Sequence, residues 1–179
     1  MDAQLAHQRA QDSFAGVLAN VTPDRFGEPT PCTEWTIRDL IMHVVGGNNM
    51  VARPAADESS SGSADLAEAY RISAAGAVAG FAGPDAMTAI YELPFGQVPG
   101  SVLIGMRTTD VLTHAWDLAA ATGQSTDLDP ELATEMLAVA RERVQPVFRG
   151  PGRPFGAEQP CSPGRPPADR LAAFLGRAT

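Results

Sequence analysis

Apolar residues recur at helical spacing along most of the chain. The clearest example is the stripe of Ile37, Leu40, Ile41, Val44 and Val45, which share one face of a helix. The same pattern predicts five long helices, over residues of about 3–20, 36–53, 64–81, 102–122 and 130–145. Long helices in succession with little strand between them predict an all-α helix bundle.

Residues with strong positional preferences mark the ends of these helices. Thr36, with Asp39 three residues later, resembles a capping box at the start of the second helix. Gly123 is a favourable C-terminal signal for the fourth helix. Asp129 as N-cap and Pro130 in the first turn predict the start of the fifth helix.

The connections between the helices carry signals of their own. The glycines and asparagines of residues 46–49 are expected to bend or loosen the second helix, and Pro54 is expected to end it. The serine-rich residues 59–63 predict a flexible loop. Residues 89–93 and 94–100 predict a short β-hairpin before the fourth helix.

The composition changes at Arg149, after which frequent prolines prevent a continuous helix. This Pro-rich tail carries five arginines against Glu158 and Asp169, in a chain whose net charge is −8. A basic tail on an acidic bundle is expected to dock back on it, through a short apolar helix at residues 170–175. We therefore predict a bundle over residues 1–148 and a tail with a docking helix over residues 149–179.

Charge and hydropathy exclude several classes of function. The chain has no basic cluster, so neither nucleic acid nor a membrane surface is an expected partner. No apolar run approaches the ~20 residues of a membrane span. The N-terminus has neither the basic nor the apolar region of a signal peptide, which favours a cytoplasmic protein. Cys32 and Cys161 are far apart and predict no disulfide. A homodimer through an apolar helix face is a further expectation.

Three residues carry the candidate chemistry. Asp110 and His114 are four residues apart in the fourth helix, so they lie one above the other on the same face. His43 lies in the second helix. If these helices pack side by side, two imidazoles and one carboxylate converge on one divalent metal, with zinc, nickel and iron as candidate ions. Three protein ligands leave one coordination position open, which is typical of catalytic rather than structural metal sites.

The main alternative concerns the polar stripe of the fourth helix. Arg107, Asp110, His114 and Asp117 fall within an arc of about 80° on a helical wheel. A charged stripe on an otherwise apolar helix is most often its water-facing side. For Asp117 we favour this solvated face over a role in orienting an imidazole N–H. For Arg107 two interpretations stay open, the binding of a substrate carboxylate and simple pairing with Asp110.

The two other histidines have interpretations without a metal. His43 lies just beside the apolar stripe of its helix, where a histidine is usually partly buried and hydrogen-bonded. His7 has no partner at ligand spacing and is interpreted as a surface residue.

Two segments carry a family resemblance that spans nearly the whole chain. Residues 30–43, Thr-Pro-Cys-Thr-Glu-Trp-Thr-Ile-Arg-Asp-Leu-Ile-Met-His, resemble the signature of the DinB-like, mycothiol-dependent maleylpyruvate isomerase N-terminal domain family. Residues 110–123, from Asp-Val-Leu-Thr-His to Ala-Thr-Gly, resemble its second signature. Residues 94–100 and 171–177 are similar to a single-domain actinobacterial branch of this family.

The resemblance implies a DinB-like four-helix bundle of the up-down-down-up type. It implies a divalent metal, usually zinc, held by His43, Asp110 and His114, and mycothiol as a thiol co-substrate. In this family the metal binds a low-molecular-weight thiol and lowers its pKa, so that the thiolate attacks a small electrophile at neutral pH. The thiol then comes from the cofactor and not from Cys32.

The chain departs from the isomerase in two respects. It has Asp110 where the isomerase has a glutamate, and a Pro-rich tail where the isomerase has a further domain. We therefore expect a mycothiol-dependent transferase or isomerase of unknown substrate rather than maleylpyruvate isomerisation itself. The alternatives are a non-catalytic metal- or ligand-binding module, such as a sensor or sequestering protein, and a bundle whose site has decayed and which serves in assembly.

Overall fold

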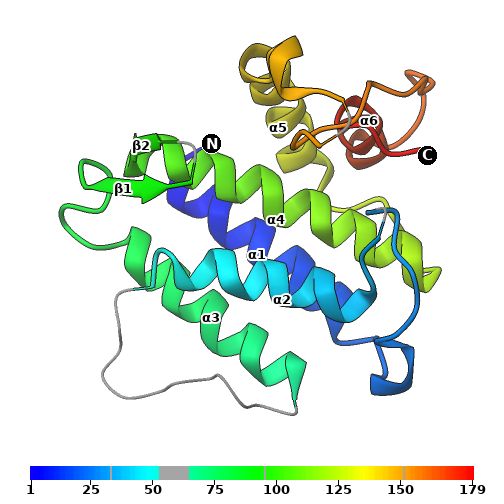
Figure 1. The fold of residues 1–179 in the computed structure, drawn as a ribbon, viewed down its shortest axis with the longest axis horizontal. Helices are drawn as coiled ribbons and strands as arrows, with labels where there is room; N and C mark the ends of the chain where they lie inside the picture. Colours follow the sequence, from blue (N-terminus) through cyan, green and yellow to red (C-terminus); the bar gives the residue numbers. More distant parts are fainter. Residues whose placement is uncertain (33, 53–64, 95, 151) are drawn as a thin grey trace.

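The computed structural model describes residues 1–32, 34–52, 65–94, 96–150 and 152–179. Its centre is a bundle of four helices, α1 (Ala3–Leu18), α2 (Ile37–Asn49), α3 (Leu66–Phe81) and α4 (Gly100–Thr122). α1 and α4 run in one direction and α2 and α3 in the other, which confirms the predicted all-α, up-down-down-up bundle (Figure 1). None of the helices in these ranges combines the length and the apolar character that a membrane span requires.

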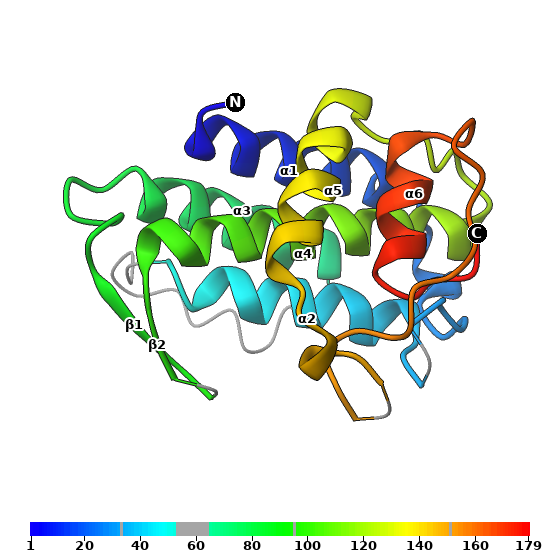
Figure 2. The ribbon, with the colours of Figure 1, turned by 90° about the horizontal axis from the view of Figure 1, so that it is seen from above.

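Two further helices lie side by side across α4. They are α5 (Pro130–Arg143) and α6 (Pro167–Phe174), seen above the bundle in Figure 1 and crossing α4 in Figure 2. The short 3-10 helices η1 (Pro23–Arg25) and η2 (Pro146–Phe148) lie in the connections. α6 is the short helix expected in the tail, and Trp116 of α4 donates a 2.7 Å hydrogen bond from Nε1 to its Asp169. A domain division at residue 148 stays a prediction.

The helix ends follow the signals in the sequence. Thr36 and Asp39 form a capping box at the start of α2, in which each side chain accepts from the other's backbone N–H. Asp129 accepts from the backbone N–H of Leu132 at the start of α5. Gly123 ends α4 in the left-handed conformation, with φ of 69°, which a residue without a Cβ adopts at low cost.

The predicted hairpin before α4 is confirmed. β1 (Ile90–Leu93) and β2 (Gly96–Pro99) pair antiparallel, and β2 leads directly into α4. The predictions for Pro54, for the serine-rich residues 59–63 and for Phe95 in the hairpin loop lie outside the described residues.

Residues 46–49 do not interrupt α2, which continues to Asn49. Whether they bend or loosen the helix, as the sequence suggests, stays a prediction. Gly47 has a packing role. The guanidinium of Arg107, from α4, lies against the α2 backbone at this point and donates to the carbonyl oxygen of Val44 at 3.3 Å. A Cβ at Gly47 would overlap this guanidinium, whereas a Cβ at Gly46 meets no atom within 4 Å. Gly47 therefore allows an arginine to be buried between α2 and α4.

His7 is not a surface residue, and that interpretation was wrong. The residue is 1% exposed and lies in α1, with its ring edge-on to Phe81 at 4.9 Å between centroids. Its Nε2 accepts from the Gln11 side chain at 3.3 Å. Burial, with a smaller contribution from the charge of Arg107, lowers the pKa of His7 to about 4. The native state therefore holds this imidazole neutral below the pH at which a free histidine takes up a proton.

We predict that the His7 pKa makes stability fall as the pH is lowered from about 6.5 to 4. The unfolded chain takes up a proton in this window while native His7 does not, so acid favours unfolding. At pH 4.5 the loss relative to pH 7 is about 2–3 kcal/mol from a folded pKa of about 4. Urea unfolding of the chelator-treated wild type and His7→Gln at both pH values measures it. An equal loss in both proteins would contradict the prediction.

A matched pair of glycine substitutions tests the packing of Arg107. Gly46→Ala is expected to leave stability unchanged or raise it by up to about 1 kcal/mol, because alanine favours helix at an unobstructed position. Gly47→Ala is expected to lower stability by about 1–3 kcal/mol, since it displaces the buried guanidinium from its hydrogen bonds. Urea unfolding at pH 7 compares the two variants. Equal effects of both substitutions would show that Arg107 does not depend on Gly47.

Candidate metal centre

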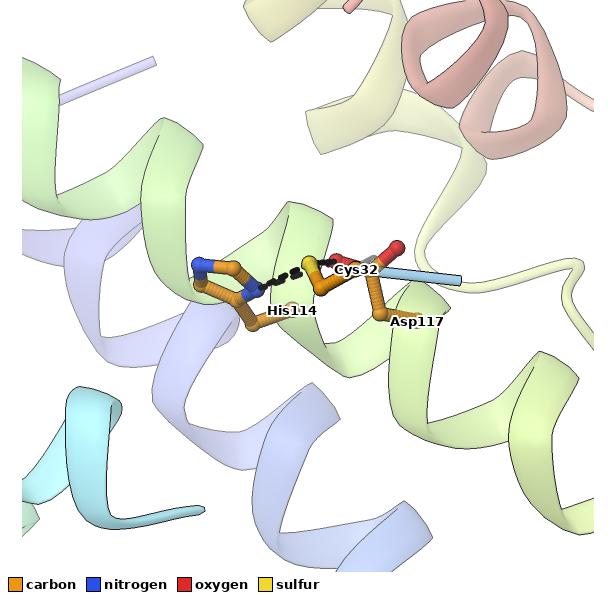
Figure 3. A group of neighbouring side chains, drawn as sticks. All are labelled: Cys32, His114 and Asp117. Atoms are coloured by element: carbon orange, nitrogen blue, oxygen red, sulfur yellow. Dashed lines mark hydrogen bonds and ion pairs between the residues drawn. The ribbon is translucent and has the colours of Figure 1, made fainter. Parts of the chain in front are cut away.

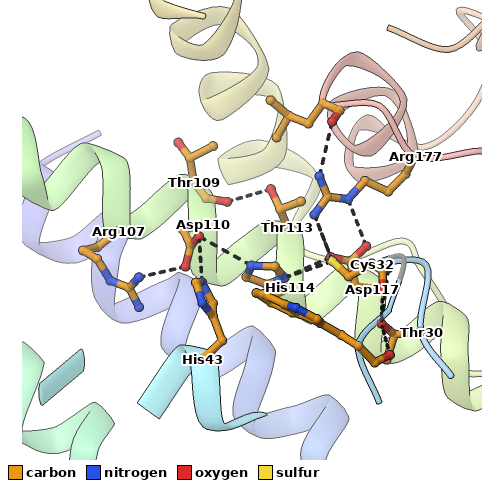
Figure 4. Close-up of polar contacts among 12 residues, drawn as sticks. Thr30, Cys32, His43, Arg107, Thr109, Asp110, Thr113, His114, Asp117 and Arg177 are labelled. Atoms are coloured by element: carbon orange, nitrogen blue, oxygen red, sulfur yellow. Dashed lines mark hydrogen bonds and ion pairs between the residues drawn. The ribbon is translucent and has the colours of Figure 1, made fainter. Parts of the chain in front are cut away.

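Asp110, His114 and His43 meet between α2 and α4. Asp110 and His114 project from successive turns of α4, and His43 faces them from α2 (Figure 4). The Oδ1 atom of Asp110 is 3.4 Å from Nε2 of His43 and 3.5 Å from Nε2 of His114. One ligand atom of each residue lies within 4.8 Å of the others. The structure thus brings together the three side chains that the sequence singled out.

The three side chains form a gradient from solvent to core. The exposed fractions of the side chains alone are 38% for His43, 30% for Asp110 and 7% for His114. The group is therefore reachable from outside while one imidazole is fixed in the bundle. Two imidazoles and a carboxylate form a donor set that suits a divalent transition metal, so the residues fit the ion that the sequence predicted.

Trp35 forms one wall of this group. Its ring centroid is 4.7 Å from that of His43 and 5.7 Å from that of His114. The two imidazoles are themselves edge-on, with centroids 4.8 Å apart. An aromatic wall restricts the rotation of both rings and keeps the ring nitrogens near Asp110.

The polar stripe of α4 is not the water-facing side of the helix. Arg107 is 8% exposed, His114 6% and Asp117 0%, so the solvated-face interpretation of this stripe was wrong. Arg107 donates from Nη1 to Oδ2 of Asp110 at 2.8 Å. The guanidinium thus holds one carboxylate oxygen of Asp110 and leaves the other, Oδ1, facing the two imidazoles.

Asp117 lies on the far side of His114 from Asp110. Its Oδ2 accepts a 3.0 Å hydrogen bond from Nδ1 of His114. Arg177, the third residue from the end of the tail, donates to both Asp117 oxygens at 3.1 and 3.0 Å. This bidentate pair neutralises a carboxylate that would otherwise be buried without a counter-charge.

Cys32 completes the polar cluster, and the sequence analysis did not expect it or Arg177 there. The Sγ atom donates to Oδ2 of Asp117 at 3.1 Å and is 3.8 Å from Nδ1 of His114. Arg177 donates to the same sulfur at 3.3 Å. Both residues lie in segments that carried the family resemblance, but no periodicity or spacing connects residue 32 or 177 to α4.

The charges of this cluster reinforce one another. Burial raises the pKa of Asp110, but the charge of His114, the hydrogen bonds from both imidazoles and the charge of Arg107 outweigh it and hold the pKa well below its usual range. Burial lowers the pKa of His114, and the carboxylates of Asp110 and Asp117 raise it well above the usual range. The cluster thus favours two ionised carboxylates, Asp110 and Asp117, whose charges are balanced by Arg107, Arg177 and a protonated His114. A metal ion that binds Nε2 of His114 would displace the proton from that nitrogen.

Comparison with known proteins gives a consistent result. Residues 7–93 match the family described as the mycothiol maleylpyruvate isomerase N-terminal domain. The uncharacterized proteins Rv0738 and MT0763, from two strains of Mycobacterium tuberculosis, are each 64% identical to the chain over 179 residues. The alignments cover 99% of the chain and 98% of each relative.

Two solved structures share the fold. The crystal structure of the mycothiol-dependent maleylpyruvate isomerase matches 76% of this chain and 67% of its own, with a TM-score of 0.60 and 22% identity. A variant of that enzyme with a histidine replaced by alanine matches over the same shares with a TM-score of 0.56. The fold is therefore DinB-like, as the sequence predicted. The chain belongs to the mycothiol maleylpyruvate isomerase N-terminal domain family, together with its mycobacterial relatives.

Proposed function

We propose that this protein binds one divalent metal ion, zinc, through His43, Asp110 and His114 and uses it to activate a low-molecular-weight thiol. Mycothiol is the thiol that the family suggests, and a small electrophile is the second substrate. The observation that carries the proposal is the convergence of the three donor groups at a position open to solvent.

The donor spacing supports an ion rather than direct hydrogen bonds alone. Two ligands of a tetrahedral zinc ion are about 3.3 Å apart at zinc–ligand bonds of about 2.0–2.1 Å. The two imidazole nitrogens lie 3.4 and 3.5 Å from Oδ1 of Asp110. These separations exceed those of strong charge-assisted hydrogen bonds, which are about 2.7–2.9 Å. Both separations from Oδ1 of Asp110 are therefore close to those expected between ligands of one zinc ion.

The neighbouring residues prepare the donor atoms. Asp117 accepts from Nδ1 of His114, so Nε2, which faces Asp110, is the nitrogen that would give up its proton to a metal ion. Arg107 donates a hydrogen bond to Oδ2 of Asp110, so Oδ1 is the carboxylate oxygen that would bind a metal ion. A zinc ion held by these three residues would supply a further coordination position and would lower the pKa of a thiol bound there.

The metal ligands can be tested one by one in a zinc titration. His43→Ala is expected to weaken zinc binding by about 100-fold or more, since it removes a ligand, and Asp117→Asn by about 10–100-fold, since it removes the group that orients His114. A competition titration against a chromophoric chelator measures both. Asp12→Asn, an exposed carboxylate of α1, is the control and is expected to bind as the wild type does. Equal affinities in wild type and His43→Ala would contradict the ligand assignment.

Thiol transfer is tested separately from metal binding. The zinc-loaded protein is expected to consume mycothiol in the presence of an electrophile from a panel, at a rate above that of the chelator-stripped protein. His43→Ala is expected to fall to the stripped rate, because it lacks the complete ligand set. Zinc binding without thiol consumption for any electrophile would favour the alternative of a non-catalytic metal-binding module.

A further inference from the structure

We propose that Cys32, His114 and Asp117 form a second metal position, with the cysteine thiolate as one ligand. In this structure the side chain of Arg177 lies against these donors in place of an ion. This inference concerns a different donor set from the proposed function but shares His114 with it. The chain would then offer one ion two alternative positions, an open one at His43 and Asp110 and a more enclosed one at Cys32 and Asp117.

The geometry of the second set is that of a small metal site. Oδ2 of Asp117 lies 3.0 Å from Nδ1 of His114 and 3.1 Å from Sγ of Cys32, and the sulfur is 3.8 Å from that nitrogen (Figure 3). Ligands of a tetrahedral zinc ion with one sulfur are separated by about 3.3–3.6 Å, given zinc–sulfur bonds of about 2.3 Å. Shifts of a few tenths of an ångström would therefore bring all three donors onto one ion.

The chemistry of the set differs from that of the first. A cysteine thiolate is a soft ligand, and together with an imidazole and a carboxylate it favours zinc and softer ions over magnesium or calcium. Asp117 is 0% exposed and His114 6%, while Cys32 is partly exposed, so this position is more enclosed than the one beside His43.

Arg177 supplies the positive charge that this set requires. Its guanidinium contacts Asp117 at 3.0 Å and Cys32 at 3.3 Å, so it lies against two of the three donors (Figure 4). Its side chain is 13% exposed and belongs to the third residue from the end of the tail. Gly176, with φ of 102°, turns the chain after α6, immediately before Arg177. An ion would replace the guanidinium once this side chain moved away from Asp117 and Cys32.

The two donor sets exclude each other through His114. The ring presents Nε2 to Asp110 and Nδ1 to Asp117, and a neutral imidazole has one lone pair, which serves one ion at a time. Removal of His43 therefore weakens only the first set, and removal of Cys32 weakens only the second.

Cobalt absorption distinguishes the two positions, because a cysteine ligand adds a sulfur-to-cobalt charge-transfer band in the near ultraviolet. His43→Ala titrated with Co²⁺ is expected to develop this band. His43→Ala with Cys32→Ser is expected to lose it, whereas His43→Ala with Cys161→Ser, which removes the other cysteine, is expected to keep it. His43 is partly exposed, so the single variant is expected to fold.

Replacement of the arginine tests its blocking role. Arg177→Gln is added to His43→Ala. The Co²⁺ concentration at which the band reaches half of its maximal intensity is expected to fall by about tenfold, because the buried carboxylate of Asp117 loses its counter-ion. The inference is overturned if neither His43→Ala nor His43→Ala with Arg177→Gln shows the band at saturating Co²⁺. It is also overturned if the band persists in His43→Ala with Cys32→Ser. Should the double variant not fold, the band in His43→Ala alone decides.

The same titration separates this inference from the proposed function. Wild type that binds Co²⁺ without the band, beside a His43→Ala variant that never shows it, supports the first set and overturns the second. If all Co²⁺ binding by the wild type gives the band and depends on Cys32, the first set is overturned and the second is supported.

Discussion

The burial of charged side chains along one face of α4 is the constraint on which the site depends. Arg107, His114 and Asp117 are each less than a tenth exposed, and a buried charge without a partner is strongly unfavourable. Each side chain therefore requires a partner from another part of the chain. α2 supplies a carbonyl oxygen and His43, and the connector before it and the end of the tail supply Cys32 and Arg177.

This constraint joins the fold to the chemistry. The face of α4 that closes the bundle is the same face that presents the donor atoms, so the site is positioned by the packing of α2 against α4. Gly47 shows the dependence directly, because the absence of its Cβ gives Arg107 the space from which it holds Asp110. Trp35 adds an aromatic wall beside both imidazoles. The donor set is thus held by a packed scaffold, which favours a preorganised site over one assembled by its ligand.

The sequence predicted the parts of this arrangement that depend on local signals. The capping box at Thr36, the left-handed Gly123 and the hairpin before α4 follow from residue preferences over a few positions. Helical periodicity also placed Asp110 above His114. It could not show which way that face points, because a charged stripe on an otherwise apolar helix is most often its water-facing side, whereas here the stripe is paired with side chains from other segments. The same limit applies to His7, and the contact of Arg177 joins segments 60 residues apart that no periodic signal relates.

The central claim is that His43, Asp110 and His114 share one divalent ion. A crystal of the full chain grown with zinc, measured on both sides of the zinc absorption edge, tests it most directly. The account predicts an anomalous peak in contact with Nε2 of His43, Oδ1 of Asp110 and Nε2 of His114. A map without a peak among these atoms, at a zinc concentration that saturates the protein, would contradict it.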